Sequence, residues 1–160
     1  MNPARAPRLA LLLATGFGAG QVPVAPGTAG SLVGLGFAFV LASTPLDPLA
    51  VAAVTAIVCI AGFPICESAA RSLGESDPAP VVWDEIAGTM VALVAVPAGW
   101  HWWAIAFVLF RVFDVLKPWP IGWLDRRVRG GAGIMLDDIV AGAFAWAGVQ
   151  ALARLAGGGD

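Results

Sequence analysis

The sequence predicts an all-α protein: a compact multihelical bundle of short helices, embedded in a membrane or associated with one, with its functional site at one end. Three observations predict this fold class. Hydrophobic residues occupy 59% of the 160 positions, and the mean hydropathy of +0.82 exceeds that of ordinary soluble domains. Ala and Leu dominate the apolar runs, and strand signals are weak. Only 12% of the residues are charged, and most of them fall in three short stretches.

Five apolar segments are expected to be helices, because Pro, Gly and polar residues bound each of them. Most are shorter than the roughly 20 residues that a membrane-spanning helix needs. Helices that span a thinned bilayer, a partly re-entrant bundle, and a compact bundle that also exists in soluble form all fit these lengths. The predicted segments are 30–43, 49–66 with a continuation to 72, 85–96, 102–116 and 138–155.

The chain is long enough for one domain, which we expect to cover residues 1–156. The glycine-rich end at 157–160 is expected to be disordered. The apolar run 9–14 follows Arg5 and Arg8 and imitates a signal peptide, but it leads into motif-like sequence. We therefore expect this run to be retained.

The predicted helices can be threaded through a membrane in chain order. If Arg5 and Arg8 are cytoplasmic, segments 67–84 and 117–137 fall on the cytoplasmic side. The far side then receives 43–48, 97–101 and the C-terminal end. This threading satisfies the positive-inside rule and gathers the charged stretches at one membrane face. The cations that it places inside are Arg71, Lys117, Arg126, Arg127 and Arg129.

Two pairs of adjacent acids border apolar segments, Asp84-Glu85 and Asp137-Asp138. Each pair can be read as capping a helix start, where a carboxylate is stabilised by about 0.3–1 kcal/mol. The alternative is a cation site, because two acids in poorly solvated surroundings repel one another. Adjacent helical residues point about 100° apart, so one member of each pair is expected to face a given site. Oxygen ligands without Cys or His favour Mg²⁺.

Arg111, Asp114 and Lys117 lie on successive turns of one predicted helix, which Pro118 ends. One reading is an ion pair between Arg111 and Asp114 with Lys117 reaching towards solvent. The other places Asp114 on the metal, with Arg111 and Lys117 on phosphate oxygens. Both readings fit the spacing.

The stretch 26–31, Pro-Gly-Thr-Ala-Gly-Ser, precedes the first long apolar segment. Glycines let backbone N–H groups converge, and a helix N-terminus attracts anions, so Thr28, Gly30 and Ser31 are candidates for holding phosphate. Taken alone the signal is weak, since Ser31 can also be an N-cap.

Several of these stretches match motifs of a known family. They are 16–20 (GFGAG), 26–31 (PGTAGS), 82–85 (VWDE), 110–120 (FRVFDVLKPWP), Asp125, and 130–142 (GGAGIMLDDIVAG). Together they resemble the phosphatidylglycerophosphatase A family of bacterial membranes, over roughly residues 14–145.

The resemblance implies Mg²⁺-dependent hydrolysis of phosphatidylglycerophosphate to phosphatidylglycerol and phosphate, within phospholipid biosynthesis. It also implies a protein of the bacterial inner membrane, and the threading above turns its active site towards the cytoplasm. Its partners would be the lipid substrate and the membrane, with no nucleic acid; a homodimer is left open. The expected metal ligands are Asp84, Glu85, Asp114, Asp137 and Asp138, with Arg111 and Lys117 on the phosphate.

Two other classes of function also fit an apolar chain with clustered charges. A small transporter or channel would use carboxylates and an arginine along an ion pathway, near the middle of the membrane. A non-catalytic lipid-binding membrane subunit would not require two pairs of acids.

Overall fold

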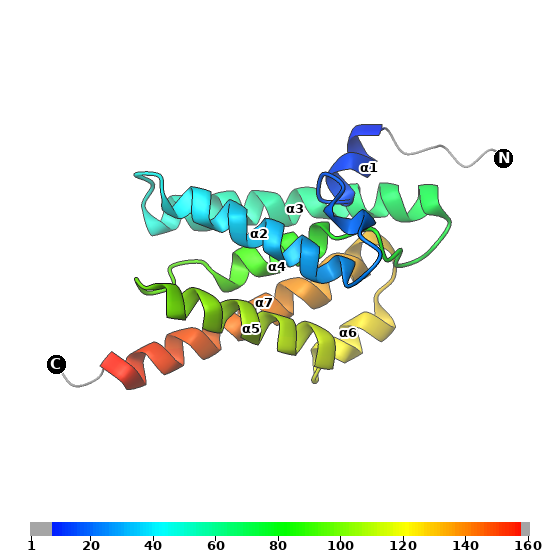
Figure 1. Ribbon diagram of the computed structural model, residues 1–160. Coiled ribbons are helices and arrows are strands. Elements are labelled where there is room, and N and C mark those ends of the chain that lie inside the picture. The colour runs from blue at the N-terminus through cyan, green and yellow to red at the C-terminus, as the bar shows by residue number, and fades with distance from the viewer. Residues whose placement is uncertain (1–7, 158–160) are drawn as a thin grey trace.

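The computed structural model describes residues 8–157, and every regular element in that range is a helix (Figure 1). The predicted all-α fold class is confirmed. The elements are α1 (Arg8–Ala14), a 3₁₀ turn η1 (Ala19–Gln21), α2 (Pro26–Ala42), α3 (Pro48–Leu73), α4 (Trp83–Ala92), α5 (Trp100–Leu116), α6 (Ile121–Arg127) and α7 (Gly130–Gly157).

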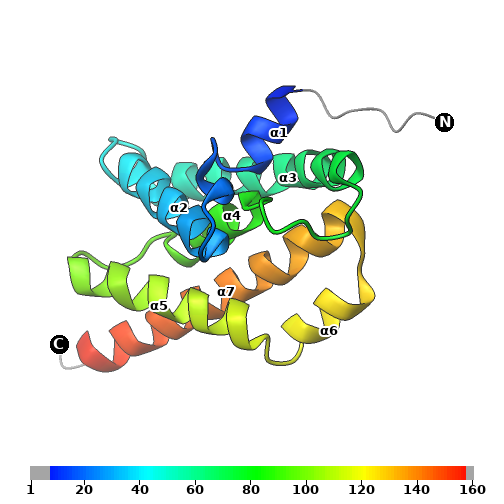
Figure 2. The same cartoon turned by 45° about the vertical axis from the view of Figure 1, so that its right-hand side comes forward.

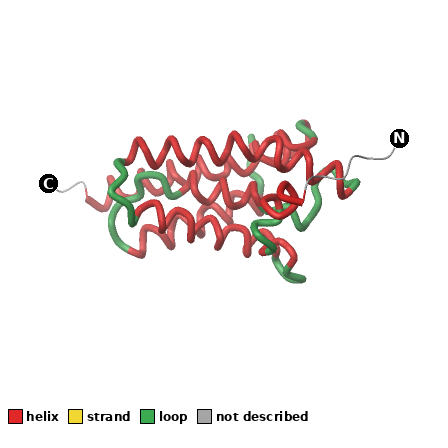
Figure 3. Tube along the Cα trace, turned by 90° about the horizontal axis from the view of Figure 1, so that it is seen from above, coloured by secondary structure: helices red, strands yellow, loops and turns green. Residues whose placement is uncertain are grey.

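The five longer helices run up and down along a common direction and form one bundle (Figures 1 and 3). Helix α4 lies inside, between α2 and α7, and α7 also contacts α3, α5 and α6 (Figure 2). The core between α3, α4 and α7 contains Cys66, Ile86 and Met135, all fully buried. The α3–α4 loop, α6 and the start of α7 gather at one end, as the threading predicts (Figure 1).

The outside of the bundle is apolar over much of its length. Helices α3 and α7 have 26 and 28 residues, which is about 39 and 42 Å at about 1.5 Å per residue. Both are long and apolar enough to cross a membrane, and only 22% of the apolar window of each is buried within the protein. Ile57 and Ile60 on α3 are 66% and 68% exposed. These features indicate association with a membrane.

Several predicted boundaries were wrong. Helix α7 begins at Gly130 instead of residue 138, and α4 ends at Ala92 instead of 96. The signal-like run is helix α1, which packs against α3, and neither α1 nor α6 was predicted. Of the tail expected to be disordered, Gly157 is helical, and 158–160 lie outside the described residues. Arg5, which the threading uses, also lies outside them.

Contacts with α3 explain the early start of α7. The Glu67 carboxylate accepts a 2.6 Å hydrogen bond from the backbone N–H of Gly131 and a 2.6 Å bond from Arg71 Nε. A Cβ on Gly131 would lie 2.7 Å from Glu67 Cβ, so only glycine allows this approach. Glycine weakens a helix by about 1 kcal/mol, but here the packing of two helices outweighs that cost.

Glycines also let α4, α5 and α7 approach closely. A Cβ on Gly88 would lie 2.6 Å from Phe110 Cε2 and 2.7 Å from the carbonyl oxygen of Asp138. On the opposite side of α4, a Cβ on Gly34 would lie 2.6 Å from the carbonyl oxygen of Ile86. The position of Asp138 relative to α4 therefore depends on the absence of a side chain at residue 88.

We expect Gly88→Ala to lower the free energy of unfolding by about 1–3 kcal/mol, because the added methyl group must displace Phe110 or α7. Gly36→Ala is the matched control, since Gly36 lies in the middle of α2 with nothing within 4 Å of its would-be Cβ. That change should be neutral or stabilising by about 0.5–1 kcal/mol. Thermal melts in detergent measure both, and equal effects would contradict the packing described here.

Candidate active site

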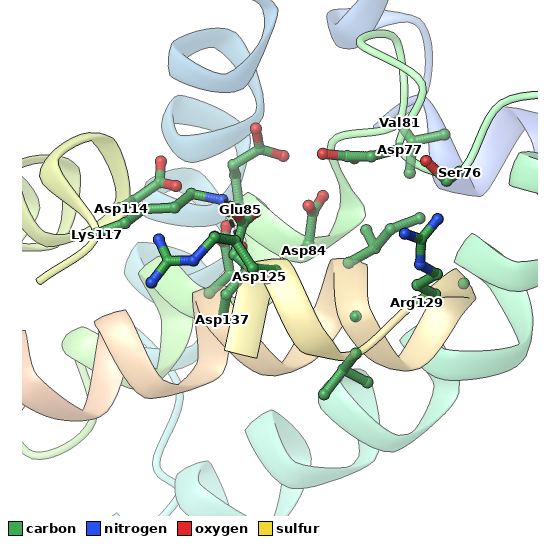
Figure 4. Close-up of a pocket in the computed structure, with 16 residues that line it drawn as sticks. Ser76, Asp77, Val81, Asp84, Glu85, Asp114, Lys117, Asp125, Arg129 and Asp137 are labelled. Carbon is green, nitrogen blue, oxygen red and sulfur yellow. Dashed lines mark hydrogen bonds and ion pairs between the residues drawn. The ribbon is translucent and has the colours of Figure 1, made fainter. Parts of the chain in front are cut away.

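A polar cavity of about 540 Å³ lies at the charged end of the bundle, between the α3–α4 loop, α4, the end of α5, α6 and the start of α7 (Figure 4). Its size suits a small headgroup. Its ionisable lining residues are Asp77, Asp84, Glu85, Asp114, Lys117, Asp125, Arg126, Arg129, Asp137 and Asp138.

Three acids form a tight cluster at the inner wall of this cavity: Asp84 and Glu85 on the first turn of α4, and Asp138 on α7. One carboxylate oxygen from each lies within 4.8 Å of the others. Asp84 and Asp138 are 8% and 3% exposed. The buried atoms Asp84 Oδ1, Glu85 Oε2 and Asp138 Oδ2 have no hydrogen-bond donor within the described residues.

Burial and mutual repulsion make the charged state of this cluster unfavourable. Two of the three acids lie on α4, which has ten residues and is not one of the candidate membrane spans. Burial raises the pKa of Asp84 well above its ordinary value, and the charges of Glu85 and Asp138 raise it further. A divalent cation would offset both effects, and three convergent carboxylates without Cys or His are a ligand set suited to Mg²⁺. The residues therefore fit the expected metal.

The interpretation of Asp137 and Asp138 as helix caps was wrong, because α7 begins seven residues before Asp137. The two side chains diverge, as adjacent helical positions must. Asp138 joins the cluster on α4, whereas Asp137 turns to Lys117. The pair Asp84 and Glu85 does begin a helix, but both of its members belong to the cluster.

Lys117 connects two acids on different helices. Its Nζ donates 2.6 Å hydrogen bonds to Asp125 Oδ1 of α6 and to Asp137 Oδ2 of α7. Lys117 follows the last residue of α5 in the left-handed conformation, with φ of 44°. Partial burial opposes its charged form, but the bonds to Asp125 and Asp137 outweigh burial, so the pKa of Lys117 lies above its ordinary value. Its ammonium is therefore a fixed positive charge at the cavity wall.

Arg111 pairs with Asp114, as the ion-pair reading predicts. Arg111 Nη1 donates to Asp114 Oδ2 at 2.5 Å and to Ser31 Oγ at 3.2 Å. The side chains of Arg111 and Asp114 are 20% and 13% exposed. Asp114 lines the cavity, whereas Arg111 is not among the lining residues. Gly27 completes this corner, since its Cβ would lie 3.3 Å from Glu85 Cδ and 3.5 Å from Arg111 Nη1.

The stretch 26–31 is not a loop, because α2 begins at Pro26. Ser31 is fully buried and donates a 2.8 Å hydrogen bond to the carbonyl oxygen of Gly27, so it is not an N-cap. A Cβ on Gly30 would lie 2.6 Å from Val82 Cβ, which shows that Gly30 serves close helix packing. Thr28, Gly30 and Ser31 are not among the residues that line the cavity. Ser31 instead contacts Arg111.

Two cavity acids were missed as site residues by reasoning from the sequence. Asp77, on the α3–α4 loop, points towards Asp84 and Glu85 (Figure 4). It follows Glu75 by two residues in a polar loop, and no local pattern distinguishes it from that acid. Asp125 belongs to a matched motif, but it precedes Arg126 and looks like a surface charge. Its proximity to Lys117 depends on the turn between α5 and α6, which the sequence pattern did not reveal.

Comparison with known sequences identifies the family. The family described as Phosphatidylglycerophosphatase A matches residues 12–153, which include the acid cluster, Arg111, Lys117 and Asp125. The chain belongs to the phosphatidylglycerophosphatase A family. It is therefore a phosphatase.

Curated relatives agree with this family. The chain is 46% identical over 132 residues to phosphatidylglycerophosphatase A of Escherichia coli K12, covering 82% of this chain and 76% of the relative. It is 41% identical over 135 residues to phosphatidylglycerophosphatase A of Haemophilus influenzae Rd, covering 84% and 82%. A Bacteroides thetaiotaomicron relative, provisionally named phosphatidylinositol-3-phosphatase, is 39% identical over 145 residues, covering 86% and 89%. No solved structure matches the chain.

Lys117→Met should lower kcat/KM by about 10²-fold or more, because it removes the fixed charge at the cavity wall. Asp125→Asn should cost less, about three- to tenfold, since Asp137 still holds the ammonium. The double variant should be no worse than Lys117→Met, because Asp125 acts through Lys117. Phosphate release under steady-state conditions measures all three.

Glu75→Gln is the control for this series, since Glu75 is an exposed acid on the same end of the bundle outside the cavity. It should retain full activity. If Asp125→Asn is as damaging as Lys117→Met and the two losses add, Asp125 has a role of its own and does not merely position Lys117.

Proposed function

We propose that this phosphatase hydrolyses the terminal phosphomonoester of phosphatidylglycerophosphate in a Mg²⁺-dependent reaction, at the cytoplasmic face of the bacterial inner membrane, within phospholipid biosynthesis. The observation that carries the proposal is the cluster of Asp84, Glu85 and Asp138 beside the fixed ammonium of Lys117. One buried oxygen of each acid has no donor within the described part of the chain. The names of the Escherichia coli and Haemophilus influenzae relatives support the substrate.

Asp84, Glu85 and Asp138 would hold the Mg²⁺. When bound, the ion supplies positive charge that offsets the phosphate charge and lowers the pKa of a bound water. Asp114 is held by Arg111, and Asp137 by Lys117. These two acids therefore border the metal site with their charges balanced by a cationic side chain. We propose that they do not coordinate the metal directly.

The remaining cavity residues bind the phosphate and handle protons. Hydrolysis breaks the bond between phosphorus and the glycerol oxygen, and water supplies the new oxygen. Lys117 Nζ would stabilise negative charge on the non-bridging oxygens as that bond breaks. Among the described residues, Asp137 Oδ1 is buried without a donor beside Lys117, so it can accept a proton from the attacking water. That proton would then pass to the departing glycerol oxygen, which leaves as the alcohol.

The surroundings of the cavity suit a lipid substrate. The apolar exterior of α3 and α7 would lie among acyl chains, while the polar cavity opens at one end of the bundle. The lipid tails would remain in the bilayer as the headgroup enters. A channel is disfavoured because the ionisable residues gather around this cavity at one end of the bundle instead of following its axis. A non-catalytic subunit is disfavoured because the acids form a site beside a fixed cation.

The provisional name of the Bacteroides relative supplies a comparison substrate. Phosphatidylglycerophosphate and phosphatidylinositol 3-phosphate are both lipids whose headgroup carries a phosphomonoester beyond the phosphodiester. Phosphate release by the purified protein from each of these lipids tests the proposal directly. We expect faster turnover of phosphatidylglycerophosphate, and no release from it would reject the proposed function.

Asp138→Asn and Glu85→Gln should each abolish turnover, because each near-isosteric change removes a ligand charge. Wild-type protein should melt at a higher temperature when Mg²⁺ is added, since a bound ligand stabilises the folded state. Both variants should lose this shift while melting at or above the temperature of metal-free wild type. Activity within about threefold of wild type at saturating Mg²⁺ would show that these acids are structural.

The charged end of the bundle should face the cytoplasm. In a background with Cys59 and Cys66 replaced by alanine, single cysteines at Ser76 and Arg127 should resist an impermeant thiol reagent in intact cells. A cysteine at Asp47, on the exposed α2–α3 loop at the opposite end, should react. All three should react after the cells are broken, and the reverse pattern in intact cells would invert the orientation.

A further inference from the structure

Two arginines of the cavity have no anionic partner among the described residues. Arg126 is the second-to-last residue of α6, and Arg129 directly precedes α7. Both line the cavity. Within residues 8–157, neither forms an ion pair or a hydrogen bond with a side chain, whereas Lys117 is paired with two acids. The guanidinium groups of Arg126 and Arg129 are therefore the uncommitted positive charges of an otherwise acidic cavity.

The two side chains lie on different sides of the cavity mouth. Arg126 Nη1 lies 3.2 Å from the position that a Cβ on Gly122 would take, which places it over the turn between α5 and α6. Arg129 rises towards Ser76 on the α3–α4 loop (Figure 4). Both residues are exposed, unlike the three carboxylates at the inner wall.

The adjacent arginine differs in its surroundings. Arg127 lies 6.0 Å from the centre of the Trp123 ring and does not line the cavity. Trp123 is itself exposed on α6. Arg127 therefore has an aromatic partner on the outside of α6, and its charge is not directed to the site.

We propose that Arg126 and Arg129 form a second anion subsite, which binds the phosphodiester of the lipid headgroup while the terminal phosphate lies at the acid cluster. This inference rests on the proposed function, because its substrate carries two phosphates separated by a glycerol unit. Guanidinium groups suit phosphate oxygens because their donors form a planar fork. A cavity of about 540 Å³ has room for a headgroup with both phosphates.

The subsite gives the phosphatase a means of selecting its substrate. A lipid whose phosphomonoester is attached directly to diacylglycerol has no second anion for the arginines. A headgroup with both phosphates engages both ends of the cavity, and the distance between the two sites then sets which headgroups fit.

The test measures coupling between the arginines and the charge of the diester. Phosphatidylglycerophosphate is compared with an analogue whose phosphodiester is replaced by an uncharged methylphosphonate linkage, both in nonionic detergent micelles without other anionic lipid. For the charged substrate, Arg126→Gln combined with Arg129→Gln should lower kcat/KM by about tenfold or more. For the neutral analogue, the same double variant should stay within about twofold of wild type.

Arg127→Gln is the matched control and should behave as wild type with both substrates. Melting temperatures verify that the variants fold. An equal loss on both substrates, or no loss on the charged one, would overturn the subsite while leaving the proposed function intact. If wild-type protein releases no phosphate from phosphatidylglycerophosphate, the proposed function itself fails, and the subsite falls with it.

Discussion

Mutual repulsion among three closely placed carboxylates is the constraint on which the rest of the site depends. Asp84, Glu85 and Asp138 present oxygens within 4.8 Å of each other, and one buried oxygen of each has no donor among residues 8–157. This arrangement lowers the stability of the bundle, because charged carboxylates must give up water when they are enclosed. A bound cation would offset the repulsion. The cluster therefore costs the bundle stability, as expected of residues placed for a site and not for packing.

Close helix packing keeps these carboxylates together against that repulsion. Gly88 lets α4 approach both Phe110 and the backbone of Asp138, and Gly27 lets the first turn of α2 approach Glu85. Glu67 fixes the start of α7 through Gly131, about two turns before Asp137 and Asp138. The glycines of the family motifs thus serve packing more than phosphate binding, which assigns the sequence 26–31 a different role from the one predicted.

The sequence revealed the all-α class, the up-and-down order of the helices and the gathering of charges at one end, because apolar length and breakers determine these features. It did not reveal that α7 begins at Gly130, because glycine has a low helix propensity. The early start of the helix depends on the contact between Gly131 and Glu67. Nor did it reveal Asp77, which has no local pattern. That Asp84 and Asp138 belong to one site was predicted, because paired acids beside apolar runs are rare. The link that Lys117 makes between Asp125 and Asp137 was not, because it depends on the turn into α6.

The distribution of charge within the cavity separates its inner and outer parts. In the inner part, the Lys117 charge at the cavity wall and the Arg111 charge outside the lining are each held by acids, so both are fixed in position and partly neutralised. At the mouth, Arg126 and Arg129 are exposed and unpaired within the described chain. An anionic headgroup approaching from a membrane surface therefore meets free guanidinium groups before it reaches the buried acids. This order suits a site in which attraction at the mouth offsets the repulsion that a phosphate would otherwise meet from the carboxylates inside.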